Sequence, residues 1–212
     1  MYNSGMLLII SGPSGSGKGT VVQRLSPEKN YALSISVTTR KQRMGERNGE
    51  EYFFIKEEAF NAMRDSGQLL EHAVFCGNCY GTPLSYVEEQ TALGKVVVLE
   101  IEVNGALQVR EIFKNAVLVF LIPPTIDELS RRLISRNTDD WESIEDRLRR
   151  AREEIKLIDQ YDYLIVNDDI DNAVDMINTI VKAESSRPSR NLNTIIEFKG
   201  DDAGCLNLPT AN

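Results

Sequence analysis

Short, continuous apolar runs rich in valine and isoleucine recur along the chain. They lie at residues 6–10, 95–103, 116–122 and 163–166. Runs that do not alternate with polar residues are typical of strands buried on both faces, as in a parallel sheet. Helical patterns separate these runs, so the chain is expected to adopt an α/β fold with a central parallel sheet.

The clearest helical pattern follows Thr138. Apolar side chains spaced by three and four residues run from Trp141 to Ile158, and this spacing predicts a helix with one apolar stripe. Its other faces carry Arg147, Arg149, Arg150 and Arg152. We interpret the last three arginines as surface charges, some of them paired with Glu145 or Glu153.

The pattern of apolar residues changes in the middle of the chain. Between Ser36 and Leu93, short β-prone pieces are interrupted by glycines, which indicates an inserted subdomain at residues 36–93. The core is then expected to comprise residues 6–35 and 94–184. After Glu184 the helical pattern breaks, so residues 185–212 are predicted to form a flexible or loosely docked tail.

The charge and the cysteines limit the partners and the compartment. A formal net charge of -8 opposes electrostatic binding of a nucleic acid polymer. No apolar run approaches the ~20 residues that span a bilayer, and the first residues lack a signal peptide's charged region, so we expect no membrane partner and a cytoplasmic location. The three cysteines, an odd number, cannot form a disulfide framework.

A glycine-rich loop follows the first predicted strand and opens a predicted helix. The nine residues are Gly12, Pro13, Ser14, Gly15, Ser16, Gly17, Lys18, Gly19 and Thr20. In this context the loop is typical of a P-loop, whose N–H groups and helix N-terminus hold a polyphosphate while the lysine reaches the outer phosphates. The alternative, a turn that only joins strand and helix, is disfavoured by Lys18 and the flanking elements.

The residue after the lysine departs from the usual P-loop pattern. A serine or threonine commonly stands there and places a hydroxyl on Mg²⁺, but this chain has Gly19. Mg²⁺, expected as the cofactor that accompanies ATP, would then be reached by Thr20 or through water, and no metal ligand is assigned.

Further motifs follow the P-loop in order. They are S-V-T-T-R at 36–40, R-x-G-E-x-N-G-x-x-Y at 43–52, G-N-x-Y-G-T at 77–82, E-I-E-V-N-G at 100–105 and L-I-P-P at 121–124. With these motifs the chain resembles the guanylate kinase family over about residues 6–184. The resemblance implies a P-loop nucleoside monophosphate kinase fold with three layers, a GMP-binding insert and a helical lid at about residues 125–150.

The resemblance also implies the substrates and a binding site. ATP and GMP or dGMP would be the partners, and the γ-phosphate of Mg-ATP would pass to GMP to give ADP and GDP. The implied GMP site comprises Ser36, Arg40, Arg43, Tyr52, Glu71, Tyr80, Thr82, Glu100 and Glu102. These residue types suit the ligand, because guanine offers N–H donors to carboxylates and a phosphate needs cations and hydroxyls.

Arginines are expected to converge on the ATP phosphates, because phosphoryl transfer depends on alignment and electrostatic stabilisation. Arg132 and Arg136 are four residues apart on one face of a predicted helix, and Arg147 lies on the next helix. By resemblance these three join Lys18 and Arg40 as the catalytic set. Arg136 would also lie near the adenine, and Asn167 would sit at the adenine edge.

Direct in-line attack by a GMP phosphate oxygen is the expected mechanism, since no enzyme nucleophile stands out. Two departures from the family bear on the geometry. Asn137 replaces the usual glycine after the lid arginine, and Cys79 replaces a common tyrosine. Cys76 and Cys79 have zinc-like spacing near His72, but four ligands are not available, so we do not expect zinc.

Two other functions remain open at this stage. One is a P-loop kinase acting on another monophosphate, against which Glu71 and Glu102 argue because adenine or uracil would leave these acceptors without donors. The other is a non-catalytic interaction module of the same fold, which loses the P-loop that this chain retains. The sequence leaves a homo-oligomer open and does not define its oligomeric state.

Overall fold

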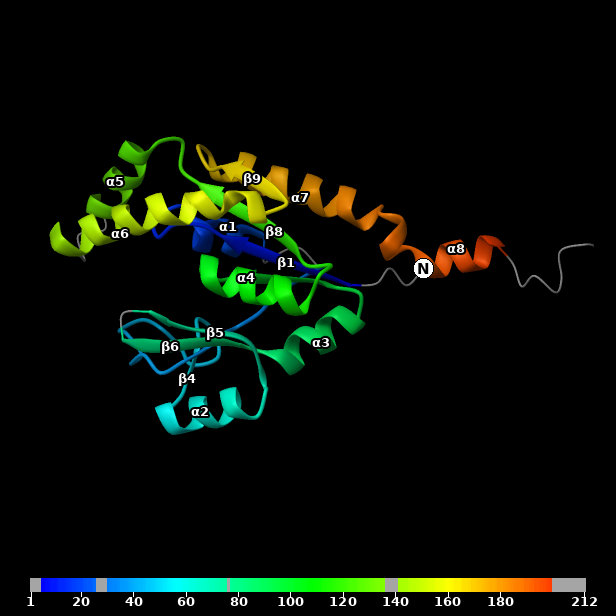
Figure 1. The fold of residues 1–212 in the computed structure, drawn as a ribbon, viewed down its shortest axis with the longest axis horizontal. Coiled ribbons are helices and arrows are strands. Elements are labelled where there is room, and N and C mark those ends of the chain that lie inside the picture. Colours follow the sequence, from blue (N-terminus) through cyan, green and yellow to red (C-terminus); the bar gives the residue numbers. More distant parts are fainter. Residues whose placement is uncertain (1–4, 26–29, 76, 136–140, 200–212) are drawn as a thin grey trace, which may run out of the picture.

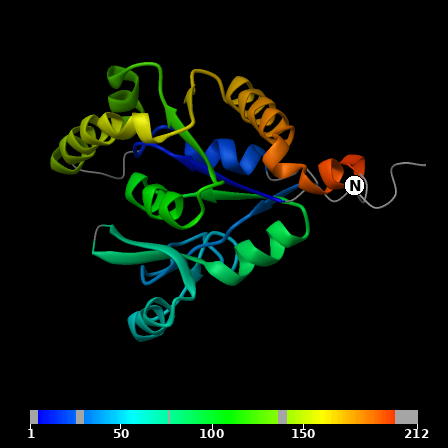
Figure 2. The same ribbon diagram turned by 45° about the vertical axis from the view of Figure 1, so that its right-hand side comes forward.

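The computed structural model describes residues 5–25, 30–75, 77–135 and 141–199. Two sheets organise this part of the chain, and they lie in separate regions of the molecule in both ribbon views (Figures 1 and 2). The larger sheet has five parallel strands in the order β2-β7-β1-β8-β9. Its strands are β1 Met6–Ser11, β2 Tyr31–Leu33, β7 Val96–Glu100, β8 Val117–Ile122 and β9 Tyr163–Val166.

Helices cover both faces of the five-stranded sheet. The covering helices are α1 Lys18–Leu25 and α7 Ile170–Ser185 on one face, and α3 Leu84–Ala92 and α4 Val103–Ile112 on the other. Alternate strand residues point to opposite faces, so Leu8 packs with α1 and α7 while Ile9 packs with α3 and α4. The predicted α/β fold with a central parallel sheet in a three-layer arrangement is confirmed. The run at 163–166 is not buried on both faces as predicted, because β9 is an edge strand in which Leu164 and Val166 are each 46% exposed.

The smaller sheet falls within residues 36–93, the segment predicted as an insert. Its order is β4-β3-β6-β5, and helix α2 Glu57–Asp65 connects β4 to β5. The strands are β3 Val37–Thr38, β4 Phe53–Phe54, β5 Leu69–Phe75 and β6 Asn78–Pro83. Leu70 of β5 is buried in the same apolar cluster as α3 and α4, so the small sheet is anchored to the core.

Helices α5 Ile126–Ser135 and α6 Trp141–Glu154 pack through their own apolar cluster, formed by Leu129, Leu133, Ile144 and Ala151. The predicted helix continued to Ile158, but the structure changes at Ile155 to a 3-10 helix, η1 Ile155–Gln160. An apolar spacing of three to four residues does not distinguish these two helix types.

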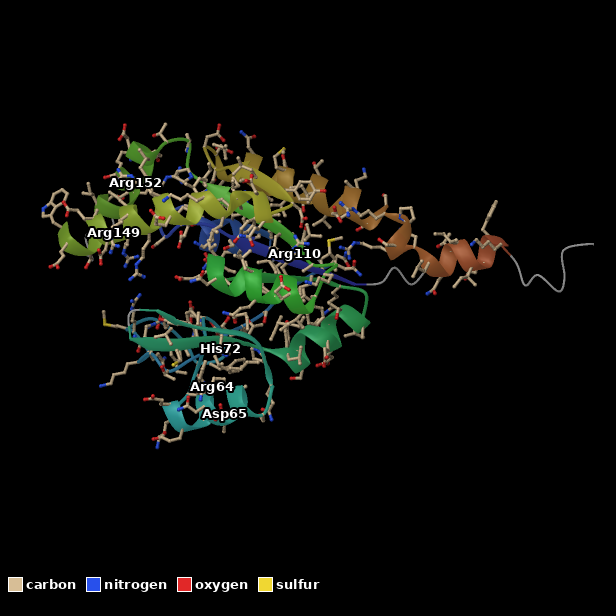
Figure 3. The ribbon with its side chains drawn as sticks, in the orientation of Figure 1. Arg64, Asp65, His72, Arg110, Arg149 and Arg152 are labelled. Carbon is tan, nitrogen blue, oxygen red and sulfur yellow. The ribbon has the colours of Figure 1, made fainter. Side chains whose placement is uncertain are left out.

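Two ion pairs involve the charged residues of α6. Arg149 pairs with Asp146 at 2.8 Å, and Glu153 pairs with Lys156 at 2.7 Å, so neither pair is one of those expected from the sequence. Arg149 and Arg152 lie along α6 (Figure 3).

The end of α7 and the first residues after it are tied to the core. Glu184, only 3% exposed, accepts a hydrogen bond from the Tyr163 hydroxyl at 2.7 Å and pairs with Arg187 at 2.8 Å. Arg190 donates to the Asn115 carbonyl at 2.7 Å. The segment η2 Pro188–Arg190 leads to α8 Leu192–Lys199, which projects away from the sheets (Figure 1). Within the described ranges, no helix has the length and hydropathy to cross a membrane.

The core packing predicts a large difference between two leucines. Leu118 of β8 is 0% exposed and Leu164 of β9 is 46% exposed. We expect Leu118→Ala to lower the free energy of unfolding by about 3 kcal/mol, because it leaves a cavity. Leu164→Ala is the control and should cost less than about 1 kcal/mol. Urea unfolding followed by circular dichroism measures both, and equal losses would contradict the assignment of the core.

Candidate functional site

The P-loop connects β1 to α1 at the carboxyl end of the sheet. Gly12, Gly15 and Gly17 adopt positive φ angles of 138°, 93° and 93°. A Cβ on Gly12 would lie 2.2 Å from the Leu121 carbonyl oxygen, and one on Gly17 would lie 2.4 Å from the Asn167 amide nitrogen. Only glycine therefore fits these two positions, both for backbone conformation and for space.

Lys18, the first residue of α1, turns back over this loop. Its ammonium donates to the carbonyl oxygens of Gly12 at 2.7 Å and Pro13 at 3.1 Å. The lysine is thus held at the rim of the loop, where its charge faces the adjoining cleft.

Two residues predicted to act on ATP, Arg132 and Asn167, instead support the P-loop through hydrogen bonds. The Asn167 amide donates to the Ser16 carbonyl at 2.8 Å, and Arg132 donates to the Asn167 carbonyl at 2.9 Å. Arg132 also pairs with Glu128 at 2.7 Å, and together Arg131 and Arg132 lower the pKa of Glu128 to about 2. In this structure Arg132 and Asn167 support the loop rather than line the cleft.

Arg147 of α6 reaches the front of the P-loop. Its guanidinium donates to the Ser14 hydroxyl at 2.6 Å. Arg147 and Lys18 consequently face the same cleft, one from α6 and the other from α1.

This cleft, of about 690 Å³, lies between the P-loop and the small sheet. It brings together eight of the nine residues predicted for the GMP site, all but Thr82, with Ser14, Lys18 and Arg147. The lining comprises Ser14, Lys18, Ser36, Arg40, Arg43, Glu46, Tyr52, Glu71, Ala73, Tyr80, Glu100, Ile101, Glu102 and Arg147. Cationic, acidic and phenolic groups therefore share one cavity.

A buried acid and hydroxyl form one part of the cleft wall. Glu71 is 5% exposed, and it accepts a hydrogen bond from the Thr82 hydroxyl at 2.7 Å. Thr82, predicted as a ligand, is 0% exposed and does not line the cleft, but its hydroxyl holds the Glu71 carboxylate that does. Gly105 of α4 leaves room for the acid, because a Cβ there would lie 2.7 Å from a Glu71 carboxylate oxygen.

The burial of Glu71 changes its protonation. Burial raises its pKa to about 7, the hydrogen bonds from Thr82 oppose the rise, and the charge of Glu102 adds to it. Glu102 is exposed over much of its surface, but its carboxyl faces the cleft and desolvation there raises its pKa. Near neutral pH, Glu71 therefore exchanges between an acceptor-only carboxylate and a protonated acid.

Arg40 forms the centre of a second group in the cleft. Its guanidinium makes two hydrogen bonds with Glu46, at 2.7 and 3.0 Å, and lies 5.4 Å from the centre of the Tyr52 ring. Tyr52 meets Tyr80 edge to face at 5.7 Å. Burial and the charge of Glu100 raise the pKa of Tyr52 to about 12, so its hydroxyl remains a donor at neutral pH.

Glu100 ends β7 directly beside β1, where it pairs in register with Ile10. Its carboxylate oxygens lie 3.4 and 3.6 Å from the point where a Cβ of residue 19 would stand. The acid thus occupies the space next to Gly19, on the side where P-loops commonly carry a hydroxyl. Thr20 is exposed on α1.

Sequence reasoning missed Glu46, Ala73 and Ile101 of the cleft lining, and Gly105, which leaves room for Glu71. Glu46 and Gly105 stood inside quoted motifs, but neither was singled out. The signal for Glu46 was an acid between two arginines, and the signal for Gly105 was a glycine inside a helical pattern, which usually has a packing reason.

Several predictions fall outside the described residues. Arg136 and Asn137 lie in the 136–140 gap, and Cys76 and Cys205 are also outside. In the part of the chain that the structure describes, no group of three or more histidine, cysteine, aspartate or glutamate side chains is placed to hold a metal ion. His72 lies on β5 (Figure 3).

Comparisons with known proteins agree on one family. The guanylate kinase family model matches residues 4–184. A guanylate kinase from Lactococcus lactis is 46% identical over 95% of this chain and 98% of its own length. One from Oceanobacillus iheyensis is 49% identical over 88% of this chain and 91% of its own. The crystal structure of guanylate kinase from Anaplasma phagocytophilum is 34% identical, has a TM-score of 0.77, and covers 93% of this chain and 96% of its own.

The geometry around Glu71 predicts a titration near neutral pH. We expect a carboxyl resonance of Glu71 to titrate at about 7 in carbon-detected NMR. Thr82→Val should raise this pKa further, because the Thr82 hydroxyl donates to the charged form and stabilises it. A Glu71 pKa below about 5 would contradict the burial of its carboxyl.

Proposed function

Because this chain belongs to the guanylate kinase family, we propose that its cleft transfers the γ-phosphate of ATP to GMP, and also to dGMP, giving ADP and the diphosphate. The supporting observation is that the P-loop lysine and the buried Glu71 line one cavity. A phosphate donor and a purine acceptor can therefore meet in it. We place this reaction in the cytoplasm.

The proposed acceptor site has two parts. Glu71 in its charged form accepts from the N1–H and amino group of guanine, and the Thr82 hydroxyl fixes the carboxylate. Ser36 and Glu102 complete the base site. Arg40, Arg43, Tyr52 and Tyr80 hold the GMP phosphate, with Glu46 orienting the Arg40 fork.

The proposed donor site is the P-loop. Residues 12–20 hold the ATP phosphates through backbone N–H groups, and Lys18 and Arg147 approach the γ-phosphate from two sides. Arg132 and Asn167 keep the loop in shape. Arg136 belongs to the proposed catalytic set and, with Asn167, to the adenine site, on resemblance alone.

The residues fit a Mg²⁺ ion bound with ATP. This ion takes oxygen ligands and water, and Glu100 offers a carboxylate beside Gly19 at the end of the sheet. Glu100 would hold the ion directly or through its water, with Thr20 as an alternative partner. The ion would neutralise charge on the transferring phosphate.

The proposed transfer is direct and in line. A GMP phosphate oxygen, already anionic, forms a bond to the γ-phosphorus while the bond from that phosphorus to the ADP bridging oxygen breaks. The electron pair of the broken bond leaves with ADP. Lys18, Arg40 and Arg147 supply positive charge around the transferring group, so alignment and electrostatics provide the rate enhancement.

A substrate panel tests the function. In a coupled ADP-release assay, we expect kcat/KM for GMP to exceed the values for AMP, UMP and dTMP by at least about 100-fold. Glu71→Gln should lower kcat/KM for GMP about 10- to 100-fold, because an amide N–H would face a guanine donor. Glu58→Gln, on exposed α2, is the matched control and should leave the value unchanged. Preference for another monophosphate would refute the proposal.

Substitution of Glu100 tests the metal site. Glu100→Gln should weaken binding of Mn²⁺ to the protein–ATP complex by about tenfold, because a carboxylate charge is lost next to the cation. Electron paramagnetic resonance of free Mn²⁺ measures this without turnover. Glu88→Gln on the exposed side of α3 should bind Mn²⁺ as the unmodified protein does. Equal binding in all three proteins would place the metal elsewhere.

A further inference from the structure

Helix α6 presents a charged stripe to the P-loop. Arg147, Arg150 and Glu154 are spaced by three and four residues, so they share one helix face. The contact of Arg147 with the Ser14 hydroxyl at 2.6 Å fixes the direction of that face. Glu154, two turns further along, therefore approaches the base of the same loop.

The Glu154 carboxyl is enclosed without full pairing. Its Oε2 atom is buried and has no hydrogen-bond partner within the described residues. The neighbouring residue Glu153 differs, because both of its carboxylate oxygens bind the exposed Lys156, at 2.7 and 2.8 Å. Since a buried, unpaired polar atom destabilises the folded state, Glu154 is not explained by stability.

Two more buried polar oxygens lie near Glu154 and close to each other. They are the hydroxyls of Ser11, the last residue of β1, and of Tyr161, directly after η1. Burial raises the pKa of Tyr161 to about 12, the nearby Ser11 hydroxyl opposes the rise, and the charge of Glu154 adds to it. These three groups form a polar cluster below the P-loop, which we term the Glu154 cluster.

Charged groups face this cluster from other elements. Burial raises the pKa of Glu154, Lys18 and Arg150 oppose the rise, and Glu102 adds to it. Lys18 comes from α1, Glu102 precedes α4, and Arg150 is on α6 itself. The acid is thus within electrostatic reach of the P-loop lysine and of the cleft's second acid.

The end of α6 coincides with Glu154. The α-helix stops at this residue, and the 3-10 helix η1 starts at Ile155. Because the two helix types differ in residues per turn, the change of type determines how the side chains of α6 are rotated relative to those of η1. Glu154 therefore stands where this change begins, two turns after Arg147 on the same face of α6.

We propose that Glu154 is a positioning residue for phosphoryl transfer, which aligns α6 and its Arg147 with Lys18 through the Glu154 cluster. The inference rests on the proposed kinase function. Glu154 touches no reacting atom in this scheme. It acts by fixing the relation between two cationic groups that must reach one phosphate together.

Glu154→Gln tests the proposal, because it keeps the shape and removes the charge. We expect kcat with GMP to fall about tenfold, while KM for GMP stays within twofold, since the acceptor residues are untouched. The affinity for Mg-ATP, measured by calorimetry, should be unchanged or up to threefold tighter, because a negative charge is lost. The melting temperature should not fall, because the enclosed site disfavours the charged form.

The matched control is Glu153→Gln, which removes an exposed charge from the adjacent position. It should retain kcat, ATP affinity and melting temperature. Tyr161→Phe is the second variant, and it should lower kcat about threefold, because it removes one hydroxyl of the cluster. Parallel losses of kcat, ATP affinity and melting temperature in Glu154→Gln would show a merely structural role and overturn the proposal, as would kcat within twofold of the unmodified protein.

A readout without GMP separates this inference from the proposed function. Trp141, the sole tryptophan, is the first residue of α6 and is 70% exposed. Saturation with Mg-ATP alone should change its fluorescence less than half as much in Glu154→Gln as in the unmodified protein and in Glu153→Gln. Equal changes would overturn the inference. Failure of the unmodified protein to phosphorylate GMP would instead overturn the proposed function.

Discussion

The closely packed glycine backbone of the P-loop is the constraint on which the rest of the site depends. Gly12 packs against Leu121 and Gly17 packs against Asn167, and this close packing fixes the backbone conformation of the loop. The sheet supplies this frame, because β1 and β8 are hydrogen-bonded neighbours at its centre. The charged side chains are placed relative to a rigid loop, and this rigidity limits the reorganisation that binding requires.

The cleft gathers four cations together with four acids in an acidic protein. A net charge of -8 would disfavour a nucleotide's approach, but the arginines and Lys18 are gathered in and around one cleft. Acids hold several of these cations in place before any ligand arrives. Glu128 does so for Arg132, and Glu46 does so for Arg40. Binding then needs little ordering of long side chains, which would otherwise cost conformational entropy.

Sequence patterns predicted the elements that have strong physical signatures. The continuous apolar runs gave the central strands, since strands buried on both faces must be apolar throughout. Strand β2 was not predicted, because three residues at a sheet edge show no periodicity. The motifs identified most of the cleft lining, but not that Arg132 and Asn167 brace the P-loop. Such roles depend on long-range packing, which residue types alone do not encode.

The paired fork of Arg40 has a consequence for anion selectivity. Because Glu46 engages the guanidinium through two hydrogen bonds, an incoming anion meets an internal competitor rather than an open cation. A singly charged, weakly coordinating ion such as chloride gains too little to displace it. In the proposed acceptor site, a phosphate dianion would also meet Arg43, Tyr52 and Tyr80 and would gain several contacts at once. Glu46 would thereby favour a phosphate dianion over simple salt anions at the proposed acceptor site.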